Sequence, residues 1–282
     1  GDKAVFIDTG TNFSIPGVME AMRRKNLRPE NIAYVIVTHV HLDHAGGAGE
    51  MVRFFPEAML VVHPRGARHM IDPSRLVAGS LAVYGEEAFR RSYGEVVPVP
   101  AERVIEAPHE FTLELNGRKL LFLDTPGHAR HHFCILDERS GGVFTGDAFG
   151  ISYREFDVDG REFVFPATTP VQFEPGAAHD SIDLIMSHHP RAAYLTHFGR
   201  VTQLPRLADG LHHMLDDFVN VAERVRDAGA VRHKQLAEGL ASYLLERLGA
   251  HGCRLPPDKA LALLENDIEL NAQGLEVWLD KA

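Results

Sequence analysis

The chain has 282 residues, of which 45% are hydrophobic and 24% are charged, as is typical of a globular protein with one large domain or a domain with an appendage. Its formal net charge is −10 and it contains no basic run, which disfavours a nucleic-acid partner because binding phosphates requires a cationic surface. No stretch approaches the roughly 18 consecutive apolar residues of a membrane span. We therefore expect neither a nucleic acid nor a membrane as a partner.

The start of the sequence and its cysteines bear on where the protein works. GDKAVFIDTG lacks the basic-then-apolar layout of a signal peptide and begins almost directly in a predicted strand, which leaves open a short missing segment upstream. Cys134 and Cys253 are far apart and form no CxxC pair, so we expect neither a disulfide framework nor a thiolate zinc site. These features favour a reducing, cytoplasmic compartment.

In the first third of the chain, short apolar runs rich in β-branched residues alternate with helical patterns. Such runs, ended by turn or polar residues, are typical of buried strands. The segment 64–95 mixes glycine, proline and charged residues, so we expect a long loop with short helices, of a length that often serves function. The predicted strands are 4–8, 32–37 and 59–63, and the predicted helices are about 16–27 and 46–55.

The middle of the chain is richer in strands. Asn116-Gly117 lies between two apolar runs, which is a strong signal for a hairpin. Strands and helices alternate here, with hairpins mixed in, and this predicts two sheets packed face to face with helices outside. The predicted strands are 110–115, 119–124, 132–137, 141–146 and 192–197, with a helix near 177–188.

From about residue 203 the pattern becomes helical. Apolar residues recur at spacings of three and four, as on an amphipathic helix, and similar patterns follow through 232–248 and 257–280. We expect a catalytic domain over 1–202 and a helical C-terminal region over 203–282 packed on it. Whether these helices cap a site or form a dimer interface is left open, so a homodimer is one of the expectations. The first of these apolar series is Leu211, Met214, Leu215, Phe218, Ala222 and Val225.

The stretch YVIVTHVHLDHAGG, residues 34–47, carries the strongest chemical signal. A buried strand ends and is followed at once by His39, His41, Asp43 and His44. Imidazoles and a carboxylate are ligands for zinc, iron or manganese. Alternation along an extended segment lets His39 and His41 point the same way, and the following turn directs Asp43 and His44 toward a second ion. The pattern predicts a metal site rather than a surface cluster of histidines.

Three later residues of ligand type also follow apolar strands, so their side chains can converge at one rim of a sheet. His128 lies in LLFLDTPGHA, Asp147 in GGVFTGDAFG and His197 in AAYLTHFGR. Each alone is most simply an ordinary loop residue. Together with the cluster at 39–44, they indicate a complete set of ligands for a metal centre.

The motifs THVHLDH, TPGH, FTGD and LTHF, in this order, resemble those of the metallo-β-lactamase superfamily over roughly residues 4–200. The resemblance implies an αββα sandwich of the α/β class with the metal site at the sheet edges. It also implies that His39, His41 and His128 bind one metal ion, that Asp43, His44 and His197 bind the other, and that Asp147 bridges the two. Every position holds the expected residue type, which favours a catalytic member over a non-catalytic binding protein.

Three further residues are weaker candidates. Asp8 matches an early acidic position of this superfamily and would orient a ligand histidine through its free ring nitrogen, unless it only caps a turn. His132 lies where glyoxalase II relatives often carry a second histidine, and the alternative is an ordinary histidine at a strand start. Tyr153 follows Asp147 as a tyrosine does in lactonase relatives, where it contacts the substrate carbonyl, but the spacing differs and a core tyrosine is the simpler interpretation.

The predicted reaction is hydrolysis of a small ester, thioester or lactone by a hydroxide shared between two divalent ions, with zinc favoured and iron or manganese open. Asp43 would orient the nucleophile and assist proton transfer. The segment 148–173 lacks the Cys-Gly-Arg-like pattern of glyoxalase II and persulfide dioxygenase relatives, which argues against a standard glutathione-thioester site. Two alternatives stay open, namely an iron-dependent oxidoreductase similar to persulfide dioxygenase and a small phosphodiesterase.

Overall fold

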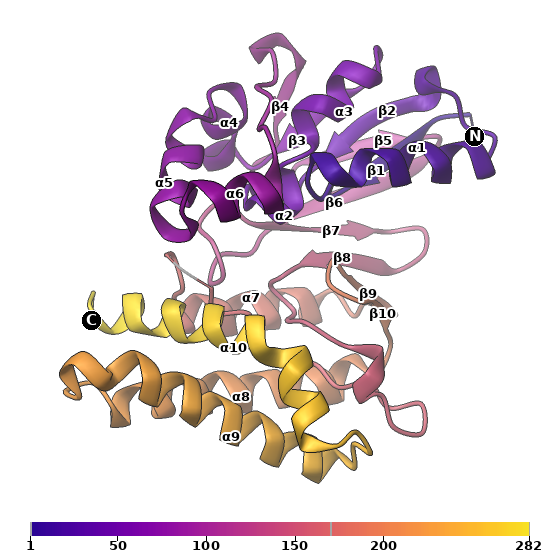
Figure 1. Cartoon of the computed structure of the whole chain (residues 1–282). Coiled ribbons are helices and arrows are strands. Elements are labelled where there is room, and N and C mark those ends of the chain that lie inside the picture. The colour runs from indigo at the N-terminus through magenta and orange to yellow at the C-terminus, as the bar shows by residue number, and fades with distance from the viewer. Residues whose placement is uncertain (1, 170, 282) are drawn as a thin grey trace. The chain divides into compact units, whose positions relative to one another are not determined.

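The computed structural model describes residues 2–169 and 171–281, and of residues 83 and 84 only the backbone. The chain forms two compact units, which are described separately below (Figure 1). The first unit comprises Gly1–Asp124 with His131–Arg139, and the second comprises Thr125–Arg130 with Ser140–Ala282. The residues predicted as the helical C-terminal region, 203–282, all belong to the second unit.

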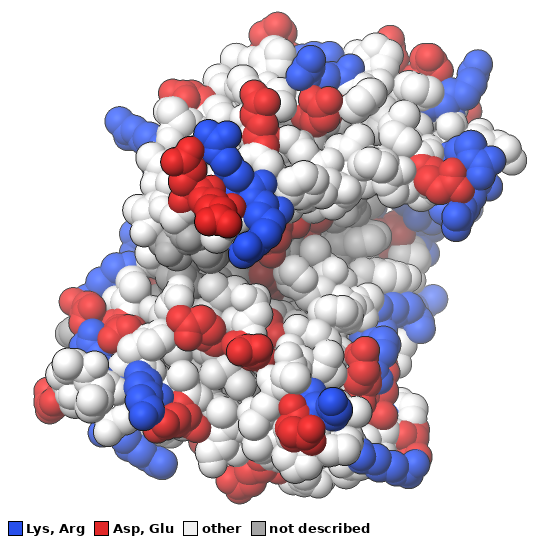
Figure 2. Space-filling view, in the orientation of Figure 1, with Lys and Arg blue, Asp and Glu red and all other residues white. Residues whose placement is uncertain are grey.

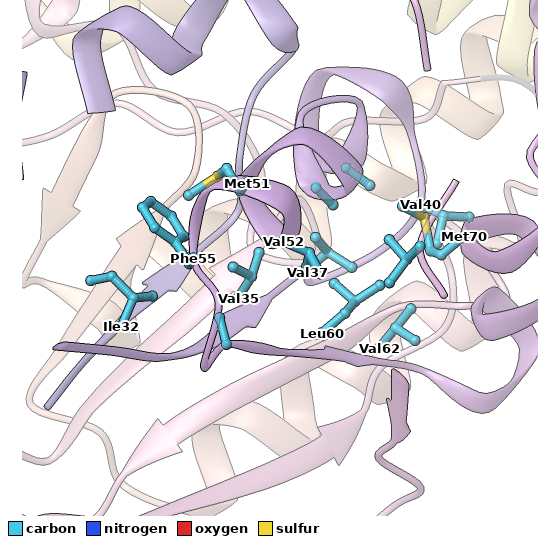
Figure 3. Packing of buried hydrophobic residues seen from close by; sticks show 14 of the residues in the cluster. Ile32, Val35, Val37, Val40, Met51, Val52, Phe55, Leu60, Val62 and Met70 are labelled. Atoms are coloured by element: carbon cyan, nitrogen blue, oxygen red, sulfur yellow. The ribbon is translucent and has the colours of Figure 1, made fainter. Parts of the chain in front are cut away.

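The first unit contains a four-stranded parallel sheet in the order β1-β2-β3-β4. Parallel neighbours require a crossover, and helices supply it here. The core of this unit forms where Val35, Leu60 and Val62 of the sheet pack against Met51 and Phe55 (Figure 3). The strands are β1 (Ala4–Ile7), β2 (Ile32–Ile36), β3 (Met59–Val62) and β4 (Val104–Glu106), and the helices between β1 and β3 are α1 (Ile15–Arg24), α2 (Leu42–Ala45) and α3 (Ala48–Phe54).

The segment predicted as a long loop with short helices does contain short helices, but they make up most of it. It forms α4 (Pro64–Ile71), α5 (Ser74–Tyr84) and α6 (Glu86–Tyr93). Some of its glycine and proline residues lie at helix ends, since Pro64 starts α4 and Gly85, with φ of 76°, separates α5 from α6, whereas Gly66 and Gly79 lie within α4 and α5. The helices form because apolar side chains such as Phe89 find a small core with Leu42 and Val96. Turn-forming residues therefore punctuate this segment without unfolding it.

Three antiparallel strands complete the first unit. They are β5 (Thr112–Leu115), β6 (Arg118–Asp124) and β7 (Phe133–Asp137). The predicted hairpin at Asn116-Gly117 is confirmed, and both residues have positive φ (53° and 72°), as a tight two-residue hairpin turn requires.

The second unit contains strands β8 (Gly142–Gly146), β9 (Ala192–Leu195) and β10 (Gly199–Val201). β8 and β9 pair in parallel, with α7 (Pro175–Ser187) in the connection between them, and β10 folds back antiparallel on β9. Asp147 therefore directly follows one of two adjacent parallel strands, and His197 follows the other after one residue. This arrangement brings the ends of both strands to the same edge.

The C-terminal part of the second unit is helical, as predicted. It comprises α8 (Leu204–Arg224), α9 (Arg232–His251) and α10 (Pro257–Leu279). Leu236, Leu240, Leu244 and Leu248 recur every fourth residue and are all buried, which explains why α9 packs along one face. Within residues 2–169 and 171–281, no helix is long and apolar enough to cross a membrane. Short 3-10 helices cover Asn12–Ser14, Pro29–Asn31, Ala101–Arg103, Arg154–Phe156 and Gly229–Val231.

Candidate metal centre

The first unit gathers the ligand-type residues of 39–44 directly after β2. The strand ends at Ile36, and the short helix α2 begins behind His41, so extended backbone changes to helix within the motif. His39 Nε2 lies 3.0 Å from His41 Nδ1. Ligand atoms lie within 4.8 Å of one another in three pairs, namely His39 with His41, His39 with His44, and Asp43 with His44. His39 and His44 are fully buried, whereas the Asp43 side chain is half-exposed.

Asp8 and Thr38 hold the two buried histidines of this cluster. Asp8 Oδ2 lies 2.8 Å from His44 Nδ1, and both carboxylate oxygens lie 3.0 Å from the Thr38 hydroxyl, which donates to them. Thr38 Oγ1 lies 3.1 Å from His39 Nδ1. A carboxylate can only accept, so Nδ1 of His44 carries a proton. The Thr38 hydroxyl uses its hydrogen for Asp8, so its oxygen accepts from Nδ1 of His39. Asp8 thus contacts His44, a predicted ligand, through one ring nitrogen and leaves the other free of this contact.

Two further histidines pack against this cluster. The His132 ring is fully buried, with its centroid 5.0 Å from that of His39. The His131 ring lies parallel to His39 at 6.2 Å and edge-on to His41 at 5.6 Å. The structure therefore brings His132 beside the cluster, and it adds His131, which sequence reasoning passed over.

The second unit brings His128, Asp147 and His197 together. Asp147 Oδ2 lies 3.4 Å from His128 Nε2, and Asp147 Oδ1 lies 3.7 Å from His197 Nε2. Asp147 and His128 are buried, whereas the His197 side chain is 30% exposed. One carboxylate thus faces one imidazole with each of its oxygens, the arrangement that a bridging ligand requires.

A chain of contacts from α10 holds His128. Its Nδ1 lies 3.0 Å from the Ala167 carbonyl oxygen. The next residue, Thr168, donates from its backbone N–H and its hydroxyl to Asn271 Oδ1, at 2.5 Å and 2.8 Å. One turn further along α10, an added Cβ on Gly274 would collide with the Thr168 carbonyl, so the helix approaches this segment closely. The C-terminal helix thereby positions the carbonyl that orients His128, a predicted ligand.

Tyr153 lies in the same unit and also contacts α10. Its hydroxyl donates to Asp267 Oδ2 at 2.6 Å, and its ring centroid lies 4.3 Å from that of Phe198, the neighbour of His197. Burial, followed by the Asp267 carboxylate, raises the pKa of the Tyr153 phenol, so it stays protonated at pH values at which an ordinary tyrosine ionises. Burial also raises the pKa of the Asp267 carboxyl. The Asp147 charge acts in the same direction, whereas the hydrogen bond from Tyr153 and the charge of His197 act against it.

The donor set fits a metal cation. His44 and His128 each hold their Nδ1 proton toward an acceptor, so in the neutral ring Nε2 presents a lone pair. That lone pair faces a carboxylate oxygen at 3.4 Å in both cases, Asp43 for His44 and Asp147 for His128. Two acceptors facing one another repel unless a cation lies between them. Histidines oriented through Nδ1 and aimed at carboxylates through Nε2 are typical of metal-binding sites.

Sequence reasoning missed Thr38, His131, Asp267 and Asn271. The signal for the last two is a pair of polar residues one turn apart on a buried face of α10, where both side chains are enclosed. From the sequence alone that face could not be identified, because α10 also carries polar residues on its exposed side.

Comparisons with known proteins place these observations in a family. The sequence profile of the Metallo-beta-lactamase superfamily matches residues 1–197. A metallo-beta-lactamase fold-containing protein, ST1585 from Sulfurisphaera tokodaii, is 28% identical over 181 residues, which are 61% of this chain and 60% of that protein. An atrochrysone carboxyl ACP thioesterase from Aspergillus fumigatus is 29% identical over 116 residues, 41% of this chain and 27% of that enzyme. The matches therefore span less than two thirds of these relatives.

Solved structures share the fold at low identity. The metallo-beta-lactamase family protein TTHA1429 from Thermus thermophilus has a TM-score of 0.69 at 19% identity, covering 100% of this chain and 86% of that one. ST1585 has a TM-score of 0.62 at 22% identity, covering 98% and 89%. A peroxy diiron species of the chemotaxis sensor ODP, a protein known from T. denticola, has a TM-score of 0.54 at 14% identity, covering 75% and 82%.

The predicted fold class, an αββα sandwich with a helical C-terminal region, is confirmed by these structures. The profile match extends over more than half of the chain and includes all seven predicted metal ligands. This chain belongs to the metallo-β-lactamase superfamily.

Proposed function

We propose that this protein is a metal-dependent hydrolase that acts on a small ester, thioester or lactone with two metal ions. His39, His41 and His128 would bind one ion, Asp43, His44 and His197 the other, and Asp147 both. The observation that carries the proposal is the facing of histidine Nε2 atoms toward carboxylate oxygens within each unit, at His44–Asp43 and His128–Asp147. Membership of the superfamily supports joining the two halves into one centre.

The metal pair, when bound, would supply an activated water and would polarise the substrate carbonyl. The protein's own part is to position and to move protons. Asp43 is half-exposed, so its carboxylate can accept a proton from the attacking water and pass it to the leaving group. Asp8 and the Ala167 carbonyl keep His44 and His128 in the tautomer that leaves Nε2 available.

Tyr153 is the candidate for contact with the substrate. A phenol whose pKa is raised above the ordinary value of about 10 stays protonated well beyond neutral pH, so Tyr153 can donate a hydrogen bond to a carbonyl oxygen that gains negative charge. In this structure the hydroxyl donates its one hydrogen to Asp267 Oδ2, so on substrate binding the hydroxyl would turn this hydrogen from Asp267 to the carbonyl oxygen. The thioesterase named among the relatives supports including thioesters in the substrate class.

A small neutral or weakly charged substrate suits the surface. On the face shown in Figure 2, Lys and Arg side chains are interspersed with Asp and Glu and form no continuous basic strip. Together with the net charge of −10, this supports a small-molecule substrate over a nucleic acid. The cytoplasmic location and the homodimer stay predictions, the latter testable by light scattering of the purified chain.

Iron-dependent redox chemistry is the second candidate. The diiron state of the chemotaxis sensor ODP shows that a protein of this fold holds two iron ions. Histidine and carboxylate ligands serve iron, zinc and manganese alike, so the ligand set leaves the metal open.

The deciding experiment is elemental analysis of protein purified without added metal, followed by an activity screen. About two zinc or manganese ions per chain, with turnover of esters, thioesters or lactones, is the expected result. Phosphodiesters are included in the screen to test the alternative of a small phosphodiesterase. Iron at one or two ions per chain, with oxygen consumption in the presence of thiols or persulfides, would instead establish the redox alternative.

Variants of two predicted ligands test whether these residues bind the metal and support turnover. His128→Ala and Asp147→Ala should each lose bound metal and reduce turnover by at least about 1,000-fold, because they remove ligands from the reacting centre. His188→Ala, an exposed histidine of the same unit, is the matched control and should retain both. Normal metal content and turnover in both ligand variants would overturn the proposal.

A further inference from the structure

Two histidines outside the candidate metal centre meet between α7 and α8. His179 Nδ1 lies 2.6 Å from His212 Nδ1, and the two rings are parallel within 2°. Their centroids are 5.0 Å apart, nearly twice the Nδ1–Nδ1 distance, so the rings meet edge to edge in one plane. The two nitrogen atoms therefore point at one another.

Each of these rings is oriented by a carboxylate of the opposite helix. His179 Nε2 lies 3.2 Å from Asp216 Oδ1, and His212 Nε2 lies 3.2 Å from Asp183 Oδ1. Each helix thus contributes one histidine and, one turn later, one aspartate, which makes the cluster nearly symmetrical. Helical geometry explains the spacing, because residues four apart lie on the same face.

The proton positions follow from these partners. A carboxylate only accepts, so both Nε2 atoms carry hydrogen, and in two neutral rings both Nδ1 atoms therefore present lone pairs. Two lone pairs 2.6 Å apart repel strongly unless a proton or a metal ion stands between them. Imidazole nitrogens whose far side is held by carboxylates are the arrangement that protein metal sites use to orient their histidines.

We propose that His179 and His212 form a separate metal site that binds one late transition-metal ion, Cu²⁺, Ni²⁺ or Zn²⁺, through their Nδ1 atoms. Asp183 and Asp216 act as positioning residues, and water completes the coordination. The general order of affinity for nitrogen ligands makes Cu²⁺ the tightest of the three. The ligands are distinct from His128, Asp147 and His197, so the site is independent of the proposed hydrolase function.

The local structure permits the required adjustment. Metal–nitrogen bonds of about 2.0–2.1 Å at a tetrahedral angle place the two nitrogens about 3.3 Å apart, so the pair must open by roughly 0.7 Å. Both histidine side chains are 27% exposed, and both aspartates are largely exposed, so solvent and ions reach the cluster and the rings have room to move. The two carboxylates add local negative charge that attracts a cation.

A metal here would tie α7 to α8. The first turn of α7 lies against the chain just before His128, because an added Cβ on Gly127 would meet Ala178 within 2.5–2.8 Å. The bound ion would therefore stiffen the helix pair beside one half of the candidate centre without touching its ligands.

The test adds Cu²⁺ to the full chain after its candidate centre has been loaded and excess metal removed. Electron paramagnetic resonance and calorimetry should show one further equivalent of Cu²⁺ with hyperfine splitting from two imidazole nitrogens. His179→Ala and His212→Ala should weaken this binding on the order of 100-fold, and Asp183→Ala with Asp216→Ala about tenfold. The melting temperature should rise with Cu²⁺ in the parent and not in His179→Ala.

His213→Ala is the matched control. His213 is the exposed neighbour of His212, and its Nδ1 lies 2.7 Å from the Asp209 carbonyl oxygen of its own helix. This variant should bind Cu²⁺ as the parent does. Absence of a saturable further equivalent in the parent, or unchanged affinity in both His179→Ala and His212→Ala, would overturn the proposal. Melting curves without Cu²⁺ establish that the variants are folded, since these side chains are not part of the core.

Discussion

The two units present their ligand-type residues in opposite ways. In the first unit, His39, His41, Asp43 and His44 lie within six consecutive residues, and the change from β2 to α2 brings them together. In the second unit, His128, Asp147 and His197 are spread over 70 positions. Asp147 and His197 meet because β8 and β9 are adjacent parallel strands, and the Ala167 carbonyl holds His128. The side chains of a local motif are thus brought together by a local change of backbone conformation, whereas those of a dispersed set are brought together by tertiary structure.

The supporting contacts differ in the same sense. Asp8 and Thr38 hold the first set from the ends of two neighbouring strands. The second set depends on α10 through the contact of Asn271 with Thr168, two residues that are 103 positions apart in sequence. The comparison therefore predicts that the second set is sensitive to changes in the C-terminal helix and that the first is not.

Among variants of the residues that support the two sets, Asp8→Asn should have the largest effect. Asp8 has φ of 57°, which asparagine tolerates well, so the variant isolates the loss of the carboxylate charge beside His44. We expect metal affinity to fall about 10- to 100-fold, measured by competition with a chelator. Asp124→Asn, which removes the charge from a similar contact to His63 within the same unit, is the control and should leave the affinity unchanged. If Asp8→Asn binds metal as tightly as Asp124→Asn does, Asp8 does not support metal binding.

Asn271→Ala tests the dependence of the second set on α10. The substitution leaves the buried Thr168 N–H without its acceptor, which costs about 1–3 kcal/mol in the free energy of unfolding. We also expect metal affinity to fall about tenfold, because the Ala167 carbonyl no longer orients His128. Gln273→Ala, which loses a surface contact to Glu269 on the same helix, should change neither quantity appreciably. A loss of stability with unchanged metal affinity would limit Asn271 to a structural role.

Tyr153→Phe removes the hydroxyl and keeps the ring that packs on Phe165 and Phe198. If the hydroxyl donates to the substrate in the transition state, kcat should fall about tenfold with little change in KM, since a lost hydrogen bond is worth about 1.4 kcal/mol. Steady-state kinetics on the best substrate of the screen measure this. An unchanged kcat would favour the simpler interpretation of Tyr153 as a packing residue.

The smallest effect concerns pH and the contact between α9 and α10. Burial lowers the pKa of His233, but the Glu269 and Glu276 carboxylates outweigh it and raise that pKa overall. The folded state therefore binds the proton more tightly than the unfolded state, and this stabilisation is present below about pH 6.5 and is lost as pH rises through the folded-state pKa. His233→Gln should lower the melting temperature at pH 6 more than at pH 9, by a small amount because the ion pairs are partly exposed. A difference that does not vary with pH would contradict this assignment.

Much of the fold could be predicted because its signals are local. The Asn116-Gly117 turn, the apolar run of β2 and the repeated leucines of α9 each specify an element within a few residues. The segment 64–95 was predicted less well. Its glycine and proline residues suggested a loop, but Phe89 and its neighbours bury apolar surface and make it helical. Burial against distant residues outweighed local propensity there.

The sequence by itself determined the family, the fold class and the identity of the seven candidate ligands, because their residue types and their places at strand ends are visible without coordinates. Only the tertiary structure decided which atoms orient them. The Asp267–Tyr153 and Asn271–Thr168 contacts, and the meeting of His179 with His212, join residues 33 to 114 positions apart. Helix packing brings these side chains within hydrogen-bond distance, and a pattern of residues along one chain does not encode which faces of two helices will meet.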